Sequence, residues 1–199
     1  TPFFQAWELA GRFPAILDDE VVGRAATELY RDARAMLDTI VEEKWLTAKA
    51  VFGLFPAAAV GDDVELEVAP GDTIVVPFLR QQVDKPAERP DFCLADFIAP
   101  KAAGLRDWMG LFAVTAGIGI EPHLERFRAD HDDYRGILLK ALADRLAESL
   151  AEHLHRRVRT EFWGYAADEA LDNDALIAEA YRGIRPAPGY PACPDHSPK

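Results

Sequence analysis

Two long stretches of the chain repeat hydrophobic residues every three or four positions, which is the period of an amphipathic helix. The first covers residues 18–43 and begins with acidic side chains, which suit the positive end of a helix dipole. The second covers residues 122–162, carries leucines at intervals of four, and is expected to bend near Asp130. A shorter helical pattern covers residues 173–181. The pattern therefore predicts two long helices and a short one.

Between the two long helices the hydrophobic period shortens to two, as it does in strands. The segments with strand character are residues 50–55, 64–68, 73–79 and 108–114. We expect Pro56 to end the first strand, because proline cannot donate to a ladder, and the apolar last strand to be buried on both faces. Short links between strands favour antiparallel pairing. This order of elements predicts the α+β class, with a central antiparallel sheet flanked by long helices.

The composition indicates a soluble, globular protein. The 199 residues are 49% hydrophobic and 28% charged, so we expect a single domain over residues 1–199. The sequence has no apolar run long enough for a membrane span, and it has no basic start followed by an apolar core, so neither a membrane anchor nor a signal peptide is expected. Because the sequence begins at Thr1 without an initiator Met, we interpret it as part of a longer polypeptide.

Net charge and cysteine content limit which classes of partner and which cellular compartment we expect for the protein. The formal net charge of −12 repels a phosphate backbone, so nucleic acid is not an expected partner. Cys93 and Cys193 are too few for a disulfide framework, which favours a cytoplasmic protein with reduced thiols. A basic cluster over residues 153–159 has two interpretations: it suits the C-terminal end of a helix, or it receives an acidic partner protein.

The sequence lacks the motifs of the common catalytic classes. It contains neither Gly-x-Gly-x-x-Gly nor Gly-x-Ser-x-Gly, and the glycines of residues 115–119 have the wrong spacing for a phosphate loop. A zinc site on Cys193 and His196 would need two further ligands, which no motif supplies. Residues 131–134 are better explained as a helix cap than as an acid–base set. We therefore predict no catalytic residue and no metal ligand.

The proline-rich segment of residues 184–196 is the strongest candidate for a binding loop. Its four prolines each fix φ and lack a backbone donor, so we expect a stiff, extended loop that displays its carbonyls and amides. The loop carries the guanidinium of Arg185, the aromatic ring of Tyr190, and Gly189, which permits close approach of a ligand. These groups suit an elongated ligand with a carboxylate and a flat ring. From composition alone, the alternative is a proline-rich tail.

Several strings of residues are shared with one protein family. Besides the loop, they are Phe13-Pro14 and residues 16–23, 53–57, 60–63, 79–82, 93–97, 131–134, 140–148 and 163–166. Over essentially its whole length, the chain resembles the activation domain of cobalamin-dependent methionine synthase. That module binds S-adenosylmethionine (AdoMet) and uses it to re-methylate an oxidised B12 cofactor.

The resemblance implies an AdoMet site on this chain. By motif, Arg185 would grip the methionine carboxylate, the backbone around Ala187 would bond the adenine, Gly189 would allow close approach, and Tyr190 would shape the groove. A guanidinium fork fits a carboxylate bidentately, so the chemistry agrees with the first of these roles. Helical periodicity alone places Glu148 on a solvated surface, but the resemblance makes it a ligand-binding carboxylate that offsets the positive charge of AdoMet.

The resemblance also implies how the module works. Cobalamin would be held by a neighbouring domain of the same enzyme, and flavodoxin or a related reductase would deliver the electron. The module itself would bind AdoMet without turnover. Family members continue past both ends of this chain, with an aspartate before it and a tyrosine pair after it near the ligand. The alternative is a docking module that caps the corrinoid domain and has weak AdoMet binding or none.

Overall fold

The computed structural model describes residues 1–86 and 89–194 of the chain. The chain divides into two compact units, and each is described by itself. Unit 1 consists of Thr1–Val51 and Ala113–Arg156, and unit 2 consists of Phe52–Phe112 and Arg157–Lys199. The strands β1 (Thr47–Val60) and β4 (Asp107–Ile118) therefore each contribute residues to both units.

Unit 1 is built mainly from helices. They are α1 (Pro2–Gln5), the 3₁₀ turn η1 (Ala15–Asp18), α2 (Gly23–Glu43), α3 (Glu121–Ala129) and α4 (Asp133–Arg157, of which the last residue belongs to unit 2). The first long helix starts later than predicted, because Asp19 caps the turn that precedes it. The carboxylate of Asp19 accepts hydrogen bonds from the amides of Val21 and Val22 at 2.8 and 2.9 Å. These two bonds lower the pKa of Asp19.

The second predicted helix is two helices rather than one bent helix. Residues 130–132 separate α3 from α4, and His131 adopts the left-handed conformation with φ of 56°. The side chain of Asp132 then accepts a hydrogen bond from the amide of Arg135 at 2.9 Å, which is the geometry of an N-terminal cap. The capping interpretation of this segment is therefore confirmed. At its other end, α4 passes into a π-helical turn, η4 (Val158–Phe162).

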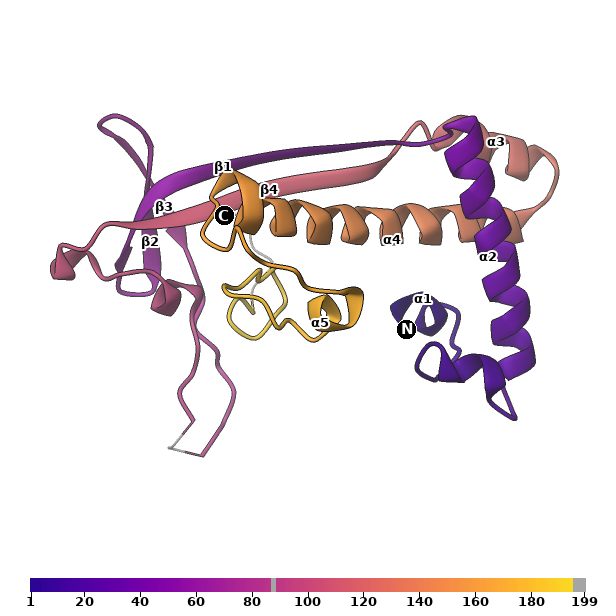
Figure 1. Cartoon of the computed structure of the whole chain (residues 1–199), viewed down its shortest axis with the longest axis horizontal. Helices are drawn as coiled ribbons and strands as arrows, with labels where there is room; N and C mark the ends of the chain where they lie inside the picture. Colours follow the sequence, from indigo (N-terminus) through magenta and orange to yellow (C-terminus); the bar gives the residue numbers. More distant parts are fainter. Residues whose placement is uncertain (87–88, 195–199) are drawn as a thin grey trace. The chain divides into compact units, whose positions relative to one another are not determined.

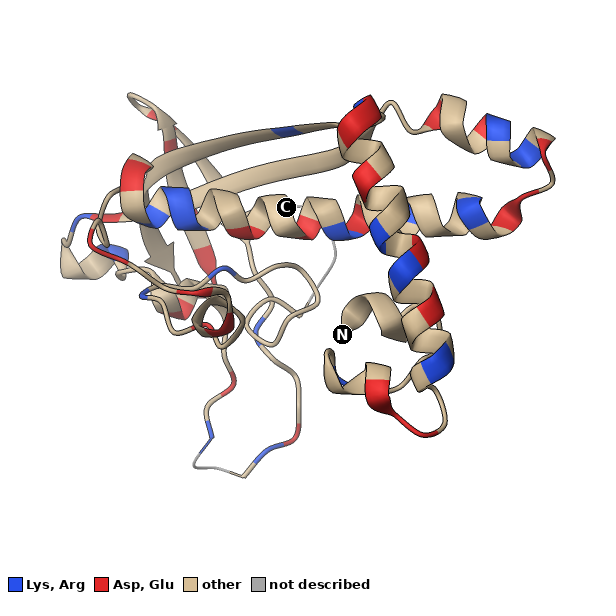
Figure 2. Cartoon of the chain, turned by 45° about the vertical axis from the view of Figure 1, so that its right-hand side comes forward, with Lys and Arg blue, Asp and Glu red and all other residues tan. Residues whose placement is uncertain are grey.

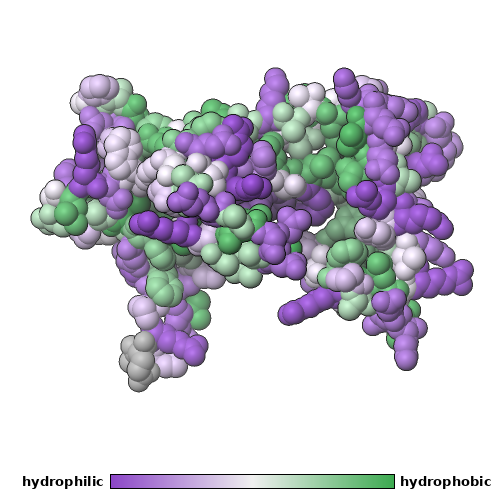
Figure 3. Space-filling model, in the orientation of Figure 1, coloured by the Kyte–Doolittle hydropathy of each residue, from purple (hydrophilic) through white to green (hydrophobic). Residues whose placement is uncertain are grey.

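The helices of unit 1 share one hydrophobic core, in which the inner face of α2 meets the first half of α4 (Figure 1). Its buried members are Phe4, Ile16, Ala26, Leu29, Ala33, Met36, Ile40, Phe127, Leu138, Leu139 and Leu142. Leu139 has no exposed surface, and full burial of a leucine contributes roughly 1.5–3 kcal/mol. Figure 2 shows charged residues of both signs along α2, and Figure 3 shows hydrophilic side chains over its outer edge. The amphipathic pattern predicted for this helix therefore matches its packing, with hydrophobic residues in the core and charged residues outside it.

A four-stranded sheet of order β3-β2-β1-β4 confirms the α+β prediction. The strand β2 (Asp63–Ala69) pairs antiparallel with β1 and with β3 (Asp72–Pro77), and β1 and β4 run side by side (Figure 1). Two details of the prediction are wrong. Pro56 does not end β1, because the ladder with β2 begins at Ala57 and so does not need an N–H from Pro56. Nor is β4 buried on both faces, since Leu111 and Phe112 are 37% and 40% exposed.

The core of unit 2 lies on one face of the paired strands. Val64 and Leu66 of β2 are fully buried, as expected for side chains two positions apart on a strand. The buried residues Ala57, Ala59, Val76, Cys93 and Ala95 complete this cluster. Cys93 and Cys193 are both buried free thiols. In the described ranges 1–86 and 89–194, no helix combines the length and the apolar composition needed to span a bilayer.

Arg80 ties the turn between β1 and β2 to the 3₁₀ turn η2 (Leu94–Phe97). Its guanidinium donates to the carboxylate of Asp62 at 2.7 Å and bidentately to that of Asp96, with both distances at 2.7 Å. Asp96 also accepts a hydrogen bond from the amide of Cys93 at 2.9 Å. The hydrogen bonds from Arg80 hold the pKa of Asp96 below its ordinary value.

The Arg80 network predicts an acid-sensitive contribution to stability. The pKa of Asp96 in the folded protein is lower than the unfolded value of about 3.9, so its contribution is complete above about pH 4 and is lost as the pH falls through the folded-state pKa. We expect Asp96→Asn to lower the free energy of unfolding in urea at pH 7, and to lower it less at pH 3. Asp144→Asn, at an exposed ion pair with Arg145, serves as the control. An equal loss for Asp96→Asn at both pH values would contradict this account.

Candidate functional site

The candidate loop folds into consecutive hydrogen-bonded turns in its second half. Residues 184–188 have no regular structure, but the amide of Tyr190 donates to the carbonyl of Ala187 at 3.2 Å, and the amide of Cys193 donates to that of Tyr190 at 2.9 Å. The amide of Gly189 also donates to the carbonyl of Cys193 at 2.8 Å. The prediction of an extended loop with free amides is therefore wrong for residues 189–193.

The backbone conformation of these turns requires a glycine. Gly189 has φ of 91°, a conformation that favours glycine over residues with a Cβ. Cys193 is 3% exposed, so it fixes the far end of the loop in the protein interior, while Tyr190 remains 61% exposed. The ring of Tyr190 is consequently available to a ligand, as the sequence predicted, although the backbone around it is closed.

The structure brings four of the five predicted ligand residues together on one loop of unit 2. Arg185 is partly buried, whereas Ala187, Gly189 and Tyr190 are exposed. Glu148 belongs to unit 1, where it occupies an exposed position on α4, in agreement with its helical periodicity. The loop residues thus form one group, and Glu148 is a separate carboxylate on the surface of its own unit.

A buried ion pair supports the segment that leads into the loop, and sequence reasoning missed it. Arg159 has no exposed surface, and its guanidinium donates to both carboxylate oxygens of Glu169 at 2.8 and 2.6 Å. The ring of Tyr181 covers the same guanidinium at 4.0 Å from its centroid. The sequence placed Arg159 in a basic cluster over residues 153–159, with an acidic partner protein as one of its two interpretations. Arg159 and His155, which is 7% exposed, are buried, so neither side chain presents its charge to such a partner.

Tyr165 supports the next residues of the same segment. Its hydroxyl donates to the carbonyl of Arg182 at 3.2 Å, and its ring packs edge-on against Trp163 at 5.4 Å. Burial raises the pKa of Tyr165, so the hydroxyl keeps its proton and stays a donor at neutral pH. Gly183 has φ of 104°, and a Cβ at this position would lie 2.7 Å from the Tyr165 hydroxyl oxygen. The string at residues 163–166 that carries the family resemblance was the available signal for this contact.

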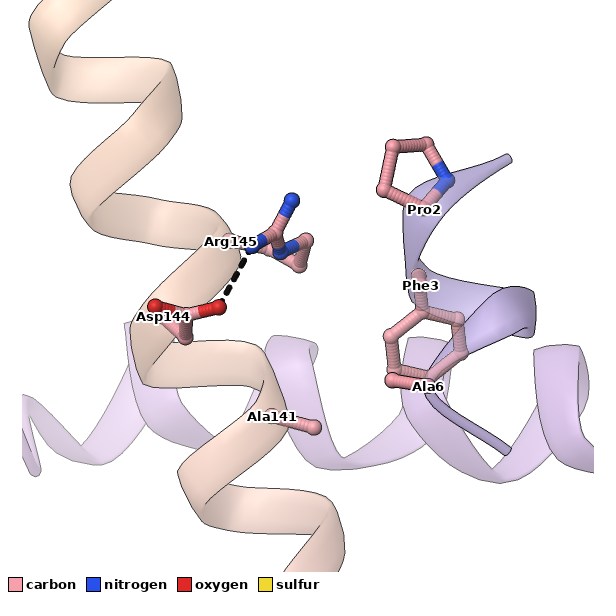
Figure 4. A pocket seen from close by; sticks show the side chains of 6 residues that line it. All are labelled: Pro2, Phe3, Ala6, Ala141, Asp144 and Arg145. Atoms are coloured by element: carbon pink, nitrogen blue, oxygen red, sulfur yellow. Dashed lines mark hydrogen bonds and ion pairs between the residues drawn. The ribbon is translucent and has the colours of Figure 1, made fainter. Parts of the chain in front are cut away.

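Two cavities in unit 1 differ greatly in size. The smaller, about 50 Å³, lies between α1 and α4, beside the Asp144–Arg145 ion pair (Figure 4). Small-molecule sites usually occupy about 300–1,000 Å³, so it is too small for a nucleoside. The larger, about 750 Å³, is open and is lined by residues of α2, α3 and α4. Its polar groups bond one another: Tyr134 donates to Asp32 at 3.0 Å, and Trp45 donates to Glu43 at 2.7 Å.

The described residues contain no group of three or more His, Cys, Asp or Glu side chains that could hold a metal ion. Cys193 is buried, and His196, the other residue considered for zinc, lies outside the described residues.

The contact between Tyr165 and Gly183 predicts a specific steric conflict. Gly183→Ala should destabilise the protein by more than Gly61→Ala, a control with φ of 62° and open space around its Cβ position. The left-handed conformation costs Gly61→Ala about 1–2 kcal/mol, whereas Gly183→Ala adds the clash to a φ of 104°, which lies outside the left-handed helical region. Adding Tyr165→Phe should recover part of the loss in Gly183→Ala, as measured by thermal unfolding. Equal losses at the two glycines would show that Tyr165 does not confine Gly183.

Comparison with known proteins agrees with this architecture. Residues 1–199 match the family described as vitamin B12 dependent methionine synthase, activation domain. A crystal structure of the MetH reactivation domain bound to AdoHcy superimposes with a TM-score of 0.88 at 54% sequence identity. The match covers 98% of this chain and 61% of that one, so the chain spans less than two thirds of its solved relative. The chain therefore belongs to the activation domain family of vitamin B12-dependent methionine synthase, a methyltransferase.

Proposed function

We propose that this chain is the AdoMet-binding reactivation module of a cobalamin-dependent methionine synthase. The observation that carries the proposal is the relative at 54% identity over 98% of this chain, whose crystal structure contains AdoHcy. AdoHcy is what remains of AdoMet once its methyl group has left, so a site that holds one presents most of the contacts that the other needs. The residues that would make those contacts are present in this chain on a folded loop.

Arg185 and Tyr190 would supply the side-chain contacts of the loop. The Arg185 side chain is partly buried, and a guanidinium in such a position binds a carboxylate more strongly than one in bulk water does. Tyr190 is 61% exposed and offers its ring as a wall for the ligand.

The backbone of the loop would supply the remaining contacts. The carbonyl of Ala187 accepts one hydrogen bond from Tyr190 and keeps a second lone pair for the amino group of adenine. Gly189 lets the ligand approach the backbone without a Cβ between them. Glu148, on unit 1, would offset the positive charge of the ammonium and sulfonium groups.

The chemistry requires position rather than an acid or a base. AdoMet, when bound, supplies an electrophilic methyl group for cobalamin that has first been reduced by flavodoxin or a related reductase. The residues of this chain would hold the methyl group in line with the cobalamin of a neighbouring domain, which is a proximity and orientation effect. The chain alone would then bind AdoMet without turnover. We expect this to take place in the cytoplasm, as part of methionine biosynthesis.

Calorimetric titration of AdoMet tests the proposed site. Arg185→Ala should weaken binding about tenfold to a hundredfold, because a charge-assisted contact to a carboxylate contributes about 1.5–3 kcal/mol. Arg106→Ala is the control, since Arg106 is an exposed arginine of the same unit that lies outside the loop segment. It should change the dissociation constant by less than about twofold.

The possible outcomes separate the site from the function. Equal effects of Arg185→Ala and Arg106→Ala would place the ligand away from this loop. Absence of AdoMet binding to the wild-type chain, under conditions where circular dichroism shows it folded, would contradict the proposed function. It would favour a docking module that caps the corrinoid domain.

A further inference from the structure

We propose that Arg159, Glu169 and Tyr165 are positioning residues for the AdoMet site, because they fix the segment from which Arg185 projects. This inference rests on the proposed function and deepens it. None of the three residues belongs to the set expected to touch AdoMet. The contacts described above lie within unit 2 and reach Tyr181 and Arg182, four and three residues before Arg185.

Arg159 is the centre of this arrangement because its charge is fully buried. A buried guanidinium is costly unless a carboxylate neutralises it and its N–H groups find acceptors. Glu169 neutralises the charge and accepts hydrogen bonds from two of the guanidinium nitrogens at 2.8 and 2.6 Å, and its own side chain is only 7% exposed. Tyr181 then packs its ring on the cation at 4.0 Å. Moving Tyr181 would uncover this cation, so the charge pair resists displacement of the segment.

Arg159 continues the buried face of α4, because it lies four residues after His155 and eight after Ala151, which are both buried, and it is the second residue of the π-helical turn η4. The amides of Trp163 and Gly164 both donate to the carbonyl of Val158, at 2.9 and 3.2 Å, and the amide of Ala166 donates to the carbonyl of Arg159 at 2.9 Å. A π turn adds one residue per turn and changes the direction of the side chains that follow. The same turn brings the chain back so that Glu169, ten residues on, reaches Arg159.

Tyr165 makes the second connection, closer to the loop. Its hydroxyl bonds the Arg182 carbonyl at 3.2 Å and stands where a Cβ on Gly183 would be. Gly183 can therefore take φ of 104° and place its backbone against the ring edge. Two residues later comes Arg185, whose guanidinium must be placed within a few tenths of an ångström to grip a carboxylate bidentately. Fixing residues 181–183 limits the positions that Arg185 can occupy.

An exposed pair in the same turn provides a matched control. Arg157 donates to Glu161 at 2.8 Å and its guanidinium lies 4.6 Å from the centroid of the Phe162 ring, so it repeats the chemistry of Arg159, Glu169 and Tyr181. The side chains of Arg157 and Glu161 are 42% and 54% exposed, and the contacts named here lie within residues 157–162. Glu161→Gln thus removes an exposed Arg–Glu pair from the same part of the chain.

The first experiment measures amide hydrogen exchange of the chain without ligand. Glu169→Gln should make the amides of Gly189, Tyr190 and Cys193 exchange about tenfold faster than in the wild type, because all three donate within the loop. Glu161→Gln should leave them unchanged. Since a buried charge is disturbed by Glu169→Gln, Tyr165→Phe is tested in parallel and should give a smaller effect, about threefold.

The second experiment is a double-substitution cycle on AdoMet affinity, at a temperature where circular dichroism shows every variant folded. Glu169→Gln should weaken AdoMet binding about tenfold. Adding Arg185→Ala to Glu169→Gln should then weaken binding clearly less than Arg185→Ala does in the wild type, because a displaced Arg185 already contributes less to the affinity. In the Tyr165→Phe background, too, Arg185→Ala should weaken AdoMet binding less than it does in the wild type. If Glu169 and Tyr165 only stabilised the fold, the fold-change in the dissociation constant of each double variant would equal the product of the fold-changes of its two single variants.

The results distinguish this inference from the proposed function. Unchanged exchange in both Glu169→Gln and Tyr165→Phe, or fully multiplicative effects on affinity, would overturn the positioning role even if AdoMet binds normally. Faster exchange in Glu169→Gln, together with a wild-type chain that binds no AdoMet at any concentration, would overturn the proposed function, and with it the positioning of AdoMet, while the coupling of Arg159 to the loop would stand.

Discussion

Full burial of the Arg159 guanidinium is the constraint on which the candidate binding loop depends. A cation without exposed surface must keep its carboxylate partner, and Glu169 is held to it by two short hydrogen bonds. Because Tyr181 covers the same cation, the position of the chain between Glu169 and the loop is restrained at both residues. An acidic chain with a net charge of −12 thus uses one of its basic residues inside rather than at the surface. These contacts fix the residues just before the loop, which itself has no helix or strand over residues 184–188.

The loop itself is restrained at both ends and by its own composition. Tyr165 holds its beginning through the Arg182 carbonyl, and the buried Cys193 holds its end. Prolines limit the backbone between these points, and Gly189 provides the left-handed conformation that the turn needs. A ligand that binds such a loop has little chain entropy to remove, so more of its contact energy appears as affinity. This explains how an exposed surface feature could bind a small, flexible molecule without a deep pocket.

The sequence predicted elements better than it predicted their connections. Periodicity indicated α2 and α4 and the strands of the sheet. The predicted strand end at Pro56 and the predicted single helix through residues 130–132 were wrong for local reasons that periodicity does not record. The motif at Arg185, Ala187, Gly189 and Tyr190 pointed to one loop, as the structure shows. The support beneath it could not be predicted, because the pairing of Arg159 with Glu169 depends on a π-helical turn. In the sequence, Arg159 resembles its neighbours Arg156 and Arg157.

The central claim is that Arg185 binds the carboxylate of AdoMet, and decarboxylated AdoMet tests it most directly. Both compounds would be titrated into the wild-type chain and into Arg185→Ala by calorimetry. The account predicts that the wild type binds decarboxylated AdoMet about tenfold to a hundredfold more weakly than AdoMet, and that Arg185→Ala binds the two compounds about equally. A variant that still prefers AdoMet as strongly as the wild type would show that another group binds the carboxylate, and would contradict the assignment of this loop.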